Sequence, residues 1–482
     1  MRRSRFLLFA IFWVLVTSVI LILNGCVEGE NKDNAVAQTP TTFGIIEEAF
    51  GLIQKKAVYP VDEDMLIEGA VRGMTDSIGD KYSTYFTKDE AAAHKELLAA
   101  ERVGIGAEIT RSNGKFIIVG PVKSSPADKA GLRPYDEIVR IDGERLEGNS
   151  LQDIVQRIRG KKGTAVKMTI FRPDEDKHIE LSVMRDTIPV KTVSSEVIED
   201  REEKIGYISI TTFGNESAKE WQNATNGLIQ KGANSLIIDV RGNPGGYLRT
   251  VSEIAGSLLP KDTVFAYMQD PKGMLSPLVP EFSDGNSFDE KLKKMPIVLL
   301  QDKGSASASE VLSGALKDLK RGFITGTTSF GKGTVQDTFK LSNGGEVKLS
   351  THKWLTPKEQ WIHGKGVKAD LEVVQSALFG EHIRLVADIY TEGDFHDDIA
   401  YGQRLLTGLG YSVGRTDGLF DESTARAVHA FRVDAKVEEG KIMDRVFFTT
   451  LKDKVEVFRK DRKNDDQLQM AIGYIHHKIS EK

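Results

Sequence analysis

The spacing of apolar residues changes several times along the chain, and each change marks a tract of different predicted structure. Across residues 41–100, apolar positions recur at helical spacing, which predicts helices over 43–53, 65–78 and 91–100. Turn-forming residues at 79–86 interrupt this pattern. So small a helical unit has little core of its own, so we expect it to pack on a partner subunit or on the main body.

From residue 101 onward the apolar runs are short and separated by turns, and from 188 to 376 they alternate with helical patterns. Such alternation of strand and helix predicts an α/β core. A segment rich in Pro, Gly, Ser and Asp at 270–290 predicts a surface loop, and residues 377–482 are helical again. The predicted strands lie at 103–109, 116–119, 166–171, 236–240, 297–301, 323–325 and 346–350, and the predicted helices at 150–158, 217–230, 247–259 and 308–320.

The N-terminal segment, residues 1–26, indicates the cellular compartment of the protein. Three arginines at positions 2, 3 and 5 precede an apolar run at 6–23, long enough to cross a bilayer with the arginines on the cytoplasmic side. The motif ending at Cys26 is similar to a bacterial lipobox, so 1–26 is either a signal anchor or a lipoprotein signal. The polar segment 27–40 predicts a tether. We therefore expect an extracytoplasmic, membrane-tethered protein.

Composition excludes several function classes. The 65 Lys and Arg against 70 Asp and Glu give a net charge of −5, which disfavours a nucleic-acid partner. The single cysteine, Cys26, excludes internal disulfides, cysteine-rich zinc sites and a catalytic thiol in the folded body. The sequence contains no HExxH, P-loop, GxSxG or GxGxxG motif, and we expect neither a metal nor another cofactor.

Three short stretches carry candidate chemistry. In the first, 304–310 (GSASASE), small residues run into a helical pattern, which places a serine near the start of a helix; simple N-capping is the alternative interpretation. In the second, Lys332 stands between two glycines, whose close packing would bury the ammonium and lower its pKa, and the amide of Gln336 would hold it; an exposed lysine in a turn is the alternative interpretation. In the third, 239–246 (DVRGNPGG), a glycine-rich turn follows a buried strand and offers N–H groups to an oxyanion.

Together these stretches resemble the C-terminal processing peptidases, the tail-specific serine proteases of family S41. The resemblance implies a crotonase- or ClpP-like α/β spiral core at 188–376, with Ser309 as nucleophile, Lys332 as general base and Gln336 as the residue that orients it. It also implies an oxyanion hole formed by the N–H of Gly245 or Gly246 and that of Glu310. A neutral lysine would take the serine proton while the serine attacks a peptide carbonyl.

Residues 101–187 resemble a PDZ domain through the motifs SPAxxAGL at 125–132 and DxIxxIDG at 136–143. PDZ domains bind an extended peptide at a sheet edge and hold its terminal carboxylate in a backbone loop. The resemblance assigns that loop to Gly104, Ile105, Gly106 and Ala107. It also suggests that Arg172 senses substrate, although an exposed charge at the end of a strand is the simpler interpretation. The implied substrates are proteins with a free, apolar C-terminus.

The helical region 377–482 contains, at about 399–451, a pattern similar to peptidoglycan-binding modules, except that Arg432 replaces the usual Gln. It binds glycan, or serves with 41–100 as a scaffold of a homodimer, or does both. We expect an endopeptidase, gated by its PDZ domain, that processes a signalling protein at a Gram-positive cell surface or, in sporulation, between two membranes. The alternatives are a catalytically silent adaptor and a Ser–His–Asp hydrolase that uses His352 or His363.

Overall fold

The structure is a computed structural model that describes residues 43–92, 101–112, 114–173, 175–189, 191–282 and 288–481. The predicted membrane segment (1–26), the linker (27–40) and most of the predicted helix at 91–100 lie outside these residues. No helix of the described part is long and apolar enough to cross a bilayer. The chain divides into two compact units, one ending at Gly79 and the other beginning at Asp80, and each is described by itself.

The described part of the first unit, residues 43–79, contains two helices, α2 (Gly44–Lys56) and α3 (Glu63–Asp76). The side chain of Asp62 caps α3 by accepting a hydrogen bond from the Met65 N–H. No residue of α2 is buried, and in α3 only Thr75 is buried. As expected from the sequence, the two helices do not build a core of their own.

The PDZ-like module forms a small antiparallel sheet in the order β3–β4–β5–β7–β8, with a separate short ribbon of β2 and β9 at its two ends. Its apolar core includes side chains from the sheet and from α6. The elements are β2 (Glu101–Gly104), β3 (Ala107–Ser112), β4 (Lys115–Pro121), α5 (Pro126–Lys129), β5 (Glu137–Ile141), β6 (Glu144–Arg145), α6 (Leu151–Ile158), β7 (Ala165–Arg172), β8 (Lys177–Met184) and β9 (Asp186–Pro189).

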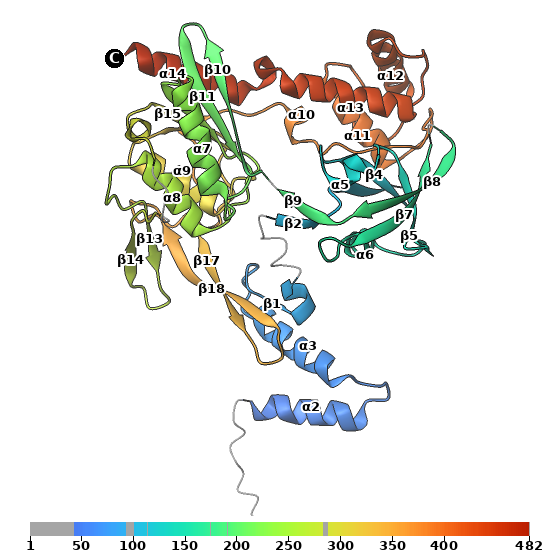
Figure 1. The fold of residues 1–482 in the computed structure, drawn as a ribbon, viewed down its shortest axis with the longest axis horizontal. Helices are drawn as coiled ribbons and strands as arrows, with labels where there is room; N and C mark the ends of the chain where they lie inside the picture. The colour runs from blue at the N-terminus through green and yellow to red at the C-terminus, as the bar shows by residue number, and fades with distance from the viewer. Residues whose placement is uncertain are drawn as a thin grey trace, which may run out of the picture. The chain divides into compact units, whose positions relative to one another are not determined.

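The α/β core is built on a six-stranded sheet in the order β10–β11–β12–β15–β16–β19, in which all neighbours from β11 onward run parallel. Figure 1 shows α8 and α9 side by side next to this sheet. The strands are β10 (Val193–Asp200), β11 (Glu203–Ile210), β12 (Ser235–Asp239), β15 (Ile297–Gln301), β16 (Phe323–Gly326) and β19 (Leu371–Glu372); the helices are α7 (Ser217–Gln230), α8 (Leu248–Leu258), the 3₁₀ turn η1 (Glu290–Lys293) and α9 (Ala308–Asp318).

The sheet is covered on both faces, because successive side chains of a strand point to opposite sides. Leu236 and Ile238 of β12 pack in the cluster formed with α7, α8 and α9. Between them, Ile237 packs in a second cluster with Leu468 and Ile475 of α14 (Asp466–Ser480). The strand is therefore buried on both faces, as its near-continuous apolar sequence predicts.

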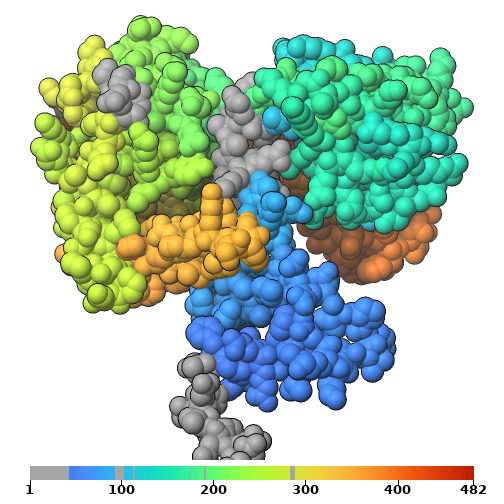
Figure 2. Space-filling model, turned by 60° about the horizontal axis from the view of Figure 1, so that its bottom comes forward, coloured from blue at the N-terminus to red at the C-terminus, as the bar shows by residue number. Residues whose placement is uncertain are grey.

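A second sheet carries the hairpin of β17 (Thr334–Lys340) and β18 (Glu346–Leu355), which is drawn in orange in Figure 2. Its order is β1–β18–β13–β14, with β17 also paired to β18. Strand β1 (Thr84–Phe86) comes from the predicted turn at 79–86. The loop prediction at 270–290 is wrong for 275–278, because β14 (Leu275–Leu278) pairs there with β13 (Ala266–Gln269).

The C-terminal helices have their own apolar cluster, which includes Phe420, Phe431 and Phe447. They are α10 (Ala377–Gly380), α11 (Asp397–Gly408), α12 (Glu422–Ala435), α13 (Arg445–Lys460) and the 3₁₀ turn η2 (Arg462–Asn464), followed by α14. The predicted fold class is confirmed: the molecule combines an α/β core and a PDZ-like module with helical regions at both ends.

Candidate active site

Three loops meet at one edge of the core sheet. They follow β12, β15 and β16, which are neighbouring parallel strands. The carboxyl ends of parallel strands lie at the same edge of a sheet, where open α/β sheets bind their ligands. The topology therefore brings together the three stretches that the sequence singled out: the glycine-rich turn, the serine turn and the loop that contains Lys332.

The serine turn presents Ser307 rather than Ser309. Ser307 precedes α9 as its N-cap, is partly exposed, and has a φ of 55° and a ψ of −113°, an unfavourable conformation for a residue with a side chain. Backbone strain of this kind persists only where the surroundings impose it, and it is concentrated at functional sites.

Ser309, the predicted nucleophile, is fully buried. Its hydroxyl donates a hydrogen bond to the carbonyl oxygen of Asn243 at 2.9 Å. As the second residue of α9 it faces the protein interior, so the hydroxyl is not presented to a substrate. The assignment of the nucleophile to Ser309 is therefore corrected; no sequence signal separated the three serines of SASASE, which all precede or begin the same helix.

The glycine-rich turn packs directly against the serine turn. Gly245 has a φ of 104°, and a Cβ atom placed on it would lie 2.7 Å from the Ala306 carbonyl oxygen, 2.8 Å from Ser307 Cβ and 3.0 Å from the Ala308 nitrogen. Only glycine permits this approach. The absence of a side chain at Gly245 thus allows the two turns to share one site.

The hydrogen bonds of these turns decide which N–H groups are open. The Gly245 N–H donates to Asn243 Oδ1 and the Glu310 N–H to the Ser307 carbonyl, both at 2.8 Å, so these two of the three predicted donors are already engaged. In contrast, the N–H groups of Gly246 and Ala308 have no acceptor among the described residues. Gly246 is exposed, and Ala308 is the first residue of α9, where a helix has unsatisfied N–H groups.

The carboxylate of Glu310 lies between the serine turn and the lysine loop and is fully buried. Its Oε1 accepts hydrogen bonds from Ser329 Oγ and the Gly331 N–H, both at 2.6 Å. Its Oε2 accepts from the N–H groups of Ser307 and Lys332, both at 2.8 Å. No functional role for this side chain was predicted from the sequence, which assigned only the backbone N–H of Glu310.

Lys332 lies in the close packing that the sequence predicts for its two glycine neighbours. A Cβ on Gly331 would meet backbone nitrogens of 364–366 at 3.0–3.1 Å, and one on Gly333 would meet Trp361 Nε1 at 2.8 Å. Burial, and then the positive charge of Lys348, lower the pKa of the Lys332 ammonium, while Asp80 and Glu310 act in the opposite direction. The net effect is a lowered pKa, which a lysine requires in order to act as a base.

The amine of Lys332 is directed to an aromatic ring rather than hydrogen-bonded to a serine. Its Nζ lies 5.0 Å from the centroid of the Tyr82 ring. Within the described residues, no hydrogen bond joins Lys332 Nζ to the hydroxyl of Ser307 or Ser309. Tyr82, which the sequence did not single out, therefore occupies the side of the site where the lysine amine lies.

Gln336 does not hold Lys332 as predicted. Its amide nitrogen donates to Thr334 Oγ1 at 2.9 Å and to Ser350 Oγ at 3.2 Å. A bulge between Val335 and Gln336 shifts the register of β17 against β18 at this position.

The two histidines of the alternative hydrolase do not complete a triad in the described part of the chain. His352 Nδ1 lies 3.0 Å from Thr351 Oγ1 and 3.8 Å from Asp337 Oδ2 on the β17–β18 hairpin. His363 stacks on Trp361, and its buried Nδ1 has no hydrogen-bond partner there. Neither histidine is hydrogen-bonded to Ser307 or Ser309.

In the PDZ-like module, the predicted carboxylate loop 104–107 leads into β3, an edge strand of the sheet. Ile105 is buried in the module core, and its carbonyl accepts a hydrogen bond from the Ala127 N–H at 2.8 Å. Gly106 has a φ of 73°, and a Cβ there would lie 2.4 Å from Ser125 Cβ. Helix α6 lies next to β3, and the other edge of β3 pairs with no described strand of this sheet. This arrangement fits the binding of an extended peptide.

Arg172 is not the exposed charge of the simpler interpretation. Its guanidinium is buried and forms a two-pronged ion pair with Asp136, with both N–O distances 2.8 Å, and it also donates to the Gly131 carbonyl. The hydrogen bonds that Arg172 donates to Asp136 raise the pKa of Arg172. The side chain joins the start of β5 to the end of β7, and contact with a substrate stays a prediction.

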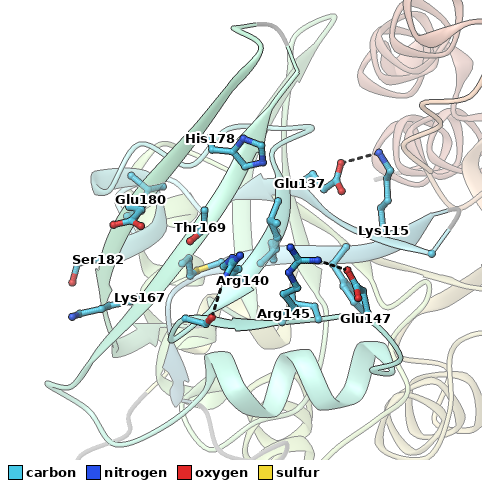
Figure 3. Close-up of a pocket in the computed structure, with 18 residues that line it drawn as sticks. Lys115, Glu137, Arg140, Arg145, Glu147, Lys167, Thr169, His178, Glu180 and Ser182 are labelled. Carbon is cyan, nitrogen blue, oxygen red and sulfur yellow. Dashed lines mark hydrogen bonds and ion pairs between the residues drawn. The ribbon is translucent and has the colours of Figure 1, made fainter.

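A cavity of about 1030 Å³ lies on the PDZ-like module, bordered by residues of β4, β5, β7 and β8. Figure 3 shows ionisable side chains among its lining residues, including Lys167, His178 and Glu180. Residues of β3, of α6 and of the loop 104–107 do not line it. The cavity is therefore separate from both the expected peptide groove and the serine and lysine loops.

In the C-terminal region, the side chain that replaces the usual Gln has a structural role. Arg432 is buried and binds both carboxylate oxygens of Asp444 at 3.0 Å. It also donates to the carbonyl of Glu438. The guanidinium thus connects α12 to the start of α13, and glycan binding by this region stays a prediction.

Comparison with known proteins agrees with this arrangement. The chain matches the family model of peptidase family S41 over residues 204–373 and a PDZ domain over 103–183. It also matches the N-terminal domain of the activating protease CtpB over 24–90. The S41 match includes all three loops of the site.

Relatives with known names extend over almost the whole chain. It is 39% identical over 430 residues to the carboxy-terminal processing protease CtpB of Bacillus subtilis (strain 168), covering 89% of this chain and 88% of that protein. It is 34% identical over 466 residues to the carboxy-terminal processing protease CtpA of the same bacterium, covering 96% of this chain and 97% of that protein. A solved structure, the photosystem II D1 C-terminal processing protease, matches with 27% identity and a TM-score of 0.44 over 69% of this chain and 87% of that one. The chain belongs to the carboxy-terminal processing serine proteases of peptidase family S41.

Proposed function

We propose that the protein cleaves peptide bonds with Ser307 as nucleophile and Lys332 as general base. The observation that carries the assignment is the strained, partly exposed backbone of Ser307 at the start of α9, packed against Gly245. Ser309, by contrast, has its hydroxyl engaged inside the protein. The family membership supports a serine mechanism, and the lowered pKa of Lys332 supports the choice of base.

In the proposed reaction, neutral Lys332 removes the proton of the Ser307 hydroxyl while Oγ attacks the substrate carbonyl carbon. The N–H groups of Ala308 and Gly246 hold the oxyanion, since they are the open donors on either side of the serine. The lysine then gives the proton to the leaving amine, and water hydrolyses the acyl-enzyme.

The lysine must move before this reaction begins, because its amine lies at the Tyr82 ring. This position supports the expectation that the enzyme rests in an inactive state and is switched by its PDZ domain. In the proposed cycle, the C-terminus of a protein substrate adds to the β3 edge, with its carboxylate in the loop 104–107, and the lysine then approaches Ser307. An apolar, unfolded tail fits this mode of binding.

We further propose that the enzyme acts as a membrane-tethered homodimer outside the cytoplasm. The described helices α2 and α3 expose apolar side chains such as Leu52 and Met65, at 53% and 73% of their maximal area. Such a surface is typical of an interface with another chain.

The decisive experiment compares three alanine variants of a soluble chain that starts at Thr41. Ser307→Ala and Lys332→Ala should each lower the rate of cleavage of a loosely folded protein by about 10³-fold or more. Ser309→Ala should keep the rate within a few-fold, since only a buried hydrogen bond worth about 1 kcal/mol is lost. Retained cleavage by Ser307→Ala would contradict the assignment.

The same assay tests selection by the PDZ domain. The substrate protein carries either an apolar or a charged C-terminal tail, and the wild-type enzyme should cleave the apolar-tailed protein faster. Equal rates would contradict tail recognition. If the wild type cleaves neither protein, a serine-directed acylating probe separates a latent protease, whose Ser307 reacts, from a catalytically silent adaptor, whose Ser307 does not.

A further inference from the structure

The carboxylate of Glu310 connects the two loops whose separation determines whether the proposed reaction can occur. Of its four hydrogen-bond donors, one belongs to the serine turn (the Ser307 N–H) and three to the lysine loop (Ser329 Oγ and the N–H groups of Gly331 and Lys332). A carboxylate offers about four acceptor positions, so its capacity is fully used. The two residues that would react, Ser307 and Lys332, donate to the same oxygen, Oε2.

This arrangement differs from ordinary helix capping. A capping carboxylate needs only local N–H groups, but Glu310 also binds a segment that begins after a different strand, β16. The contact fixes the backbone of Lys332 relative to that of Ser307, while it leaves the lysine side chain free to swing. It also holds the Ser307 N–H, at the residue with the unfavourable φ of 55°.

We propose that Glu310 is a positioning residue of the catalytic site: its carboxylate keeps the serine turn and the lysine loop at the separation that proton transfer requires. The proposal rests on the assignment of Ser307 and Lys332 made above. Positioning of this kind is worth much in catalysis, because a displacement of about 1 Å at the reacting atoms lowers the rate by about 10²-fold.

The experiment replaces the carboxylate in the soluble chain by an amide, Glu310→Gln. The amide nitrogen cannot accept hydrogen bonds, so one pair of donors loses its acceptor whichever way the amide is oriented. We expect kcat to fall about 10²-fold with KM changed less than two-fold, because the PDZ domain binds the substrate tail elsewhere.

A matched control is Glu220→Gln. The carboxylate of Glu220 on α7 accepts hydrogen bonds from the N–H groups of Thr192 and Val193 and from the Thr192 hydroxyl. It contacts neither catalytic loop, so the control measures the general effect of removing a carboxylate that binds backbone N–H groups. Its kcat should stay within three-fold of the wild type. An equal fall in both variants, or a wild-type kcat in Glu310→Gln, would overturn the proposal.

A pH profile separates the positioning role from a general loss of structure. The groups that act on the charge of Lys332 are Lys348, Asp80 and Glu310, and Tyr82 faces its amine. Because the negative charge of Glu310 raises the pKa of Lys332, its removal should lower that pKa. The rising limb of the plot of kcat against pH should then move to lower pH. Glu310→Asp keeps the charge but is one methylene shorter, so kcat should fall while the limb stays in place. A wild-type kcat in Glu310→Asp would overturn the proposal.

Thermal unfolding of each variant shows whether it is folded. If Glu310→Gln does not fold, Ser329→Ala removes one of the four donors and should lower kcat several-fold, and a wild-type kcat would then overturn the proposal. Failure of the proposed function is visible separately, because it would appear as retained cleavage by Ser307→Ala or Lys332→Ala.

Discussion

At the scale of single residues, Lys332 acts as a base only in molecules whose amine has lost its proton. The half-buried position lowers the pKa of this amine, and the nearby positive charge of Lys348 lowers it further. The rate should therefore rise with pH as Lys332 is deprotonated, at a pH below that expected for an ordinary lysine.

Replacing the neighbouring charge tests this account. In Lys348→Met, the ammonium of Lys332 loses a repulsive neighbour, so its pKa rises and the rising limb of kcat against pH should move to higher pH. Lys340→Met, at the far end of the same hairpin, removes an exposed charge and is the control, with an unchanged profile. A limb that moves to lower pH, or that moves equally in both variants, would exclude Lys332 as the titrating base.

The serines show where residue-scale prediction from the sequence ends. The motif SASASE predicted a strand–turn–helix with a serine near the helix start, and the structure has this arrangement. The helix begins at Ala308, so a difference of two positions moves the serine from the strained N-cap into the buried first turn. The predicted helix at 308–320 begins at the residue observed, so the error lay in matching the family's nucleophile to the last serine of the motif, not in locating the helix.

At the scale of secondary structure elements, the last helix, α14, supports the glycine-rich turn from outside the core. Arg241 follows β12 and forms ion pairs with Asp239 at 2.6 Å and with Asp465, the N-cap of α14, at 2.8 Å. Burial alone would raise the pKa of Asp465, but hydrogen bonds and charge from Arg241 lower it overall. The carboxylate form is therefore the one that stabilises the fold.

This pair predicts a pH-dependent stability. Because the pKa of Asp465 is lower in the folded than in the unfolded protein, its contribution is present above pH about 4 and is lost in acid. Asp465→Asn keeps an N-cap acceptor but should lower the free energy of unfolding at pH 7 by about 3 kcal/mol. Urea unfolding should show this difference shrinking below pH about 4.

The neighbouring Asp466 provides the control for that measurement. Its side chain is exposed in the first turn of α14, so Asp466→Asn should change the free energy of unfolding by less than about 0.5 kcal/mol. If Asp465→Asn were no less stable than this control at pH 7, the ion pair would not secure α14 to the core.

Elements with a strong apolar period were predictable, and those that depend on pairing were not. The helix at 217–230 and the strand at 297–301 have the predicted bounds, because each buries a periodic or continuous apolar face. The strands β14 and β17 are short or largely exposed, so their sequences carry little apolar signal. The bulge that separates Gln336 from its expected position is likewise set by the pairing with β18.

At the scale of the whole molecule, the exposed apolar surface of α2 and α3 predicts a dimer. We expect the soluble chain to be dimeric at micromolar concentration, and Leu52→Glu or Met65→Glu to make it monomeric, because a charge would be buried in the interface. Analytical ultracentrifugation gives the mass directly.

Lys56→Glu is the control for the dimer, since it reverses an exposed charge at the end of α2 without removing apolar surface. Its mass should remain that of a dimer. A monomeric wild type, or Glu variants that remain dimeric, would show that these helices do not hold two chains together.

The short ribbon of β2 and β9 has a consequence for how the protein is divided into interchangeable parts. Because residues 101–104 pair with 186–189, the PDZ domain leaves and re-enters the rest of the chain through two strands that lie side by side, about 5 Å apart. Strand β1, which comes before the PDZ domain in sequence, meanwhile belongs to a sheet of the protease core. We therefore expect the PDZ domain to be exchangeable: another peptide-binding domain whose two ends lie side by side would fit the same junction and leave every described strand of the protease core in place.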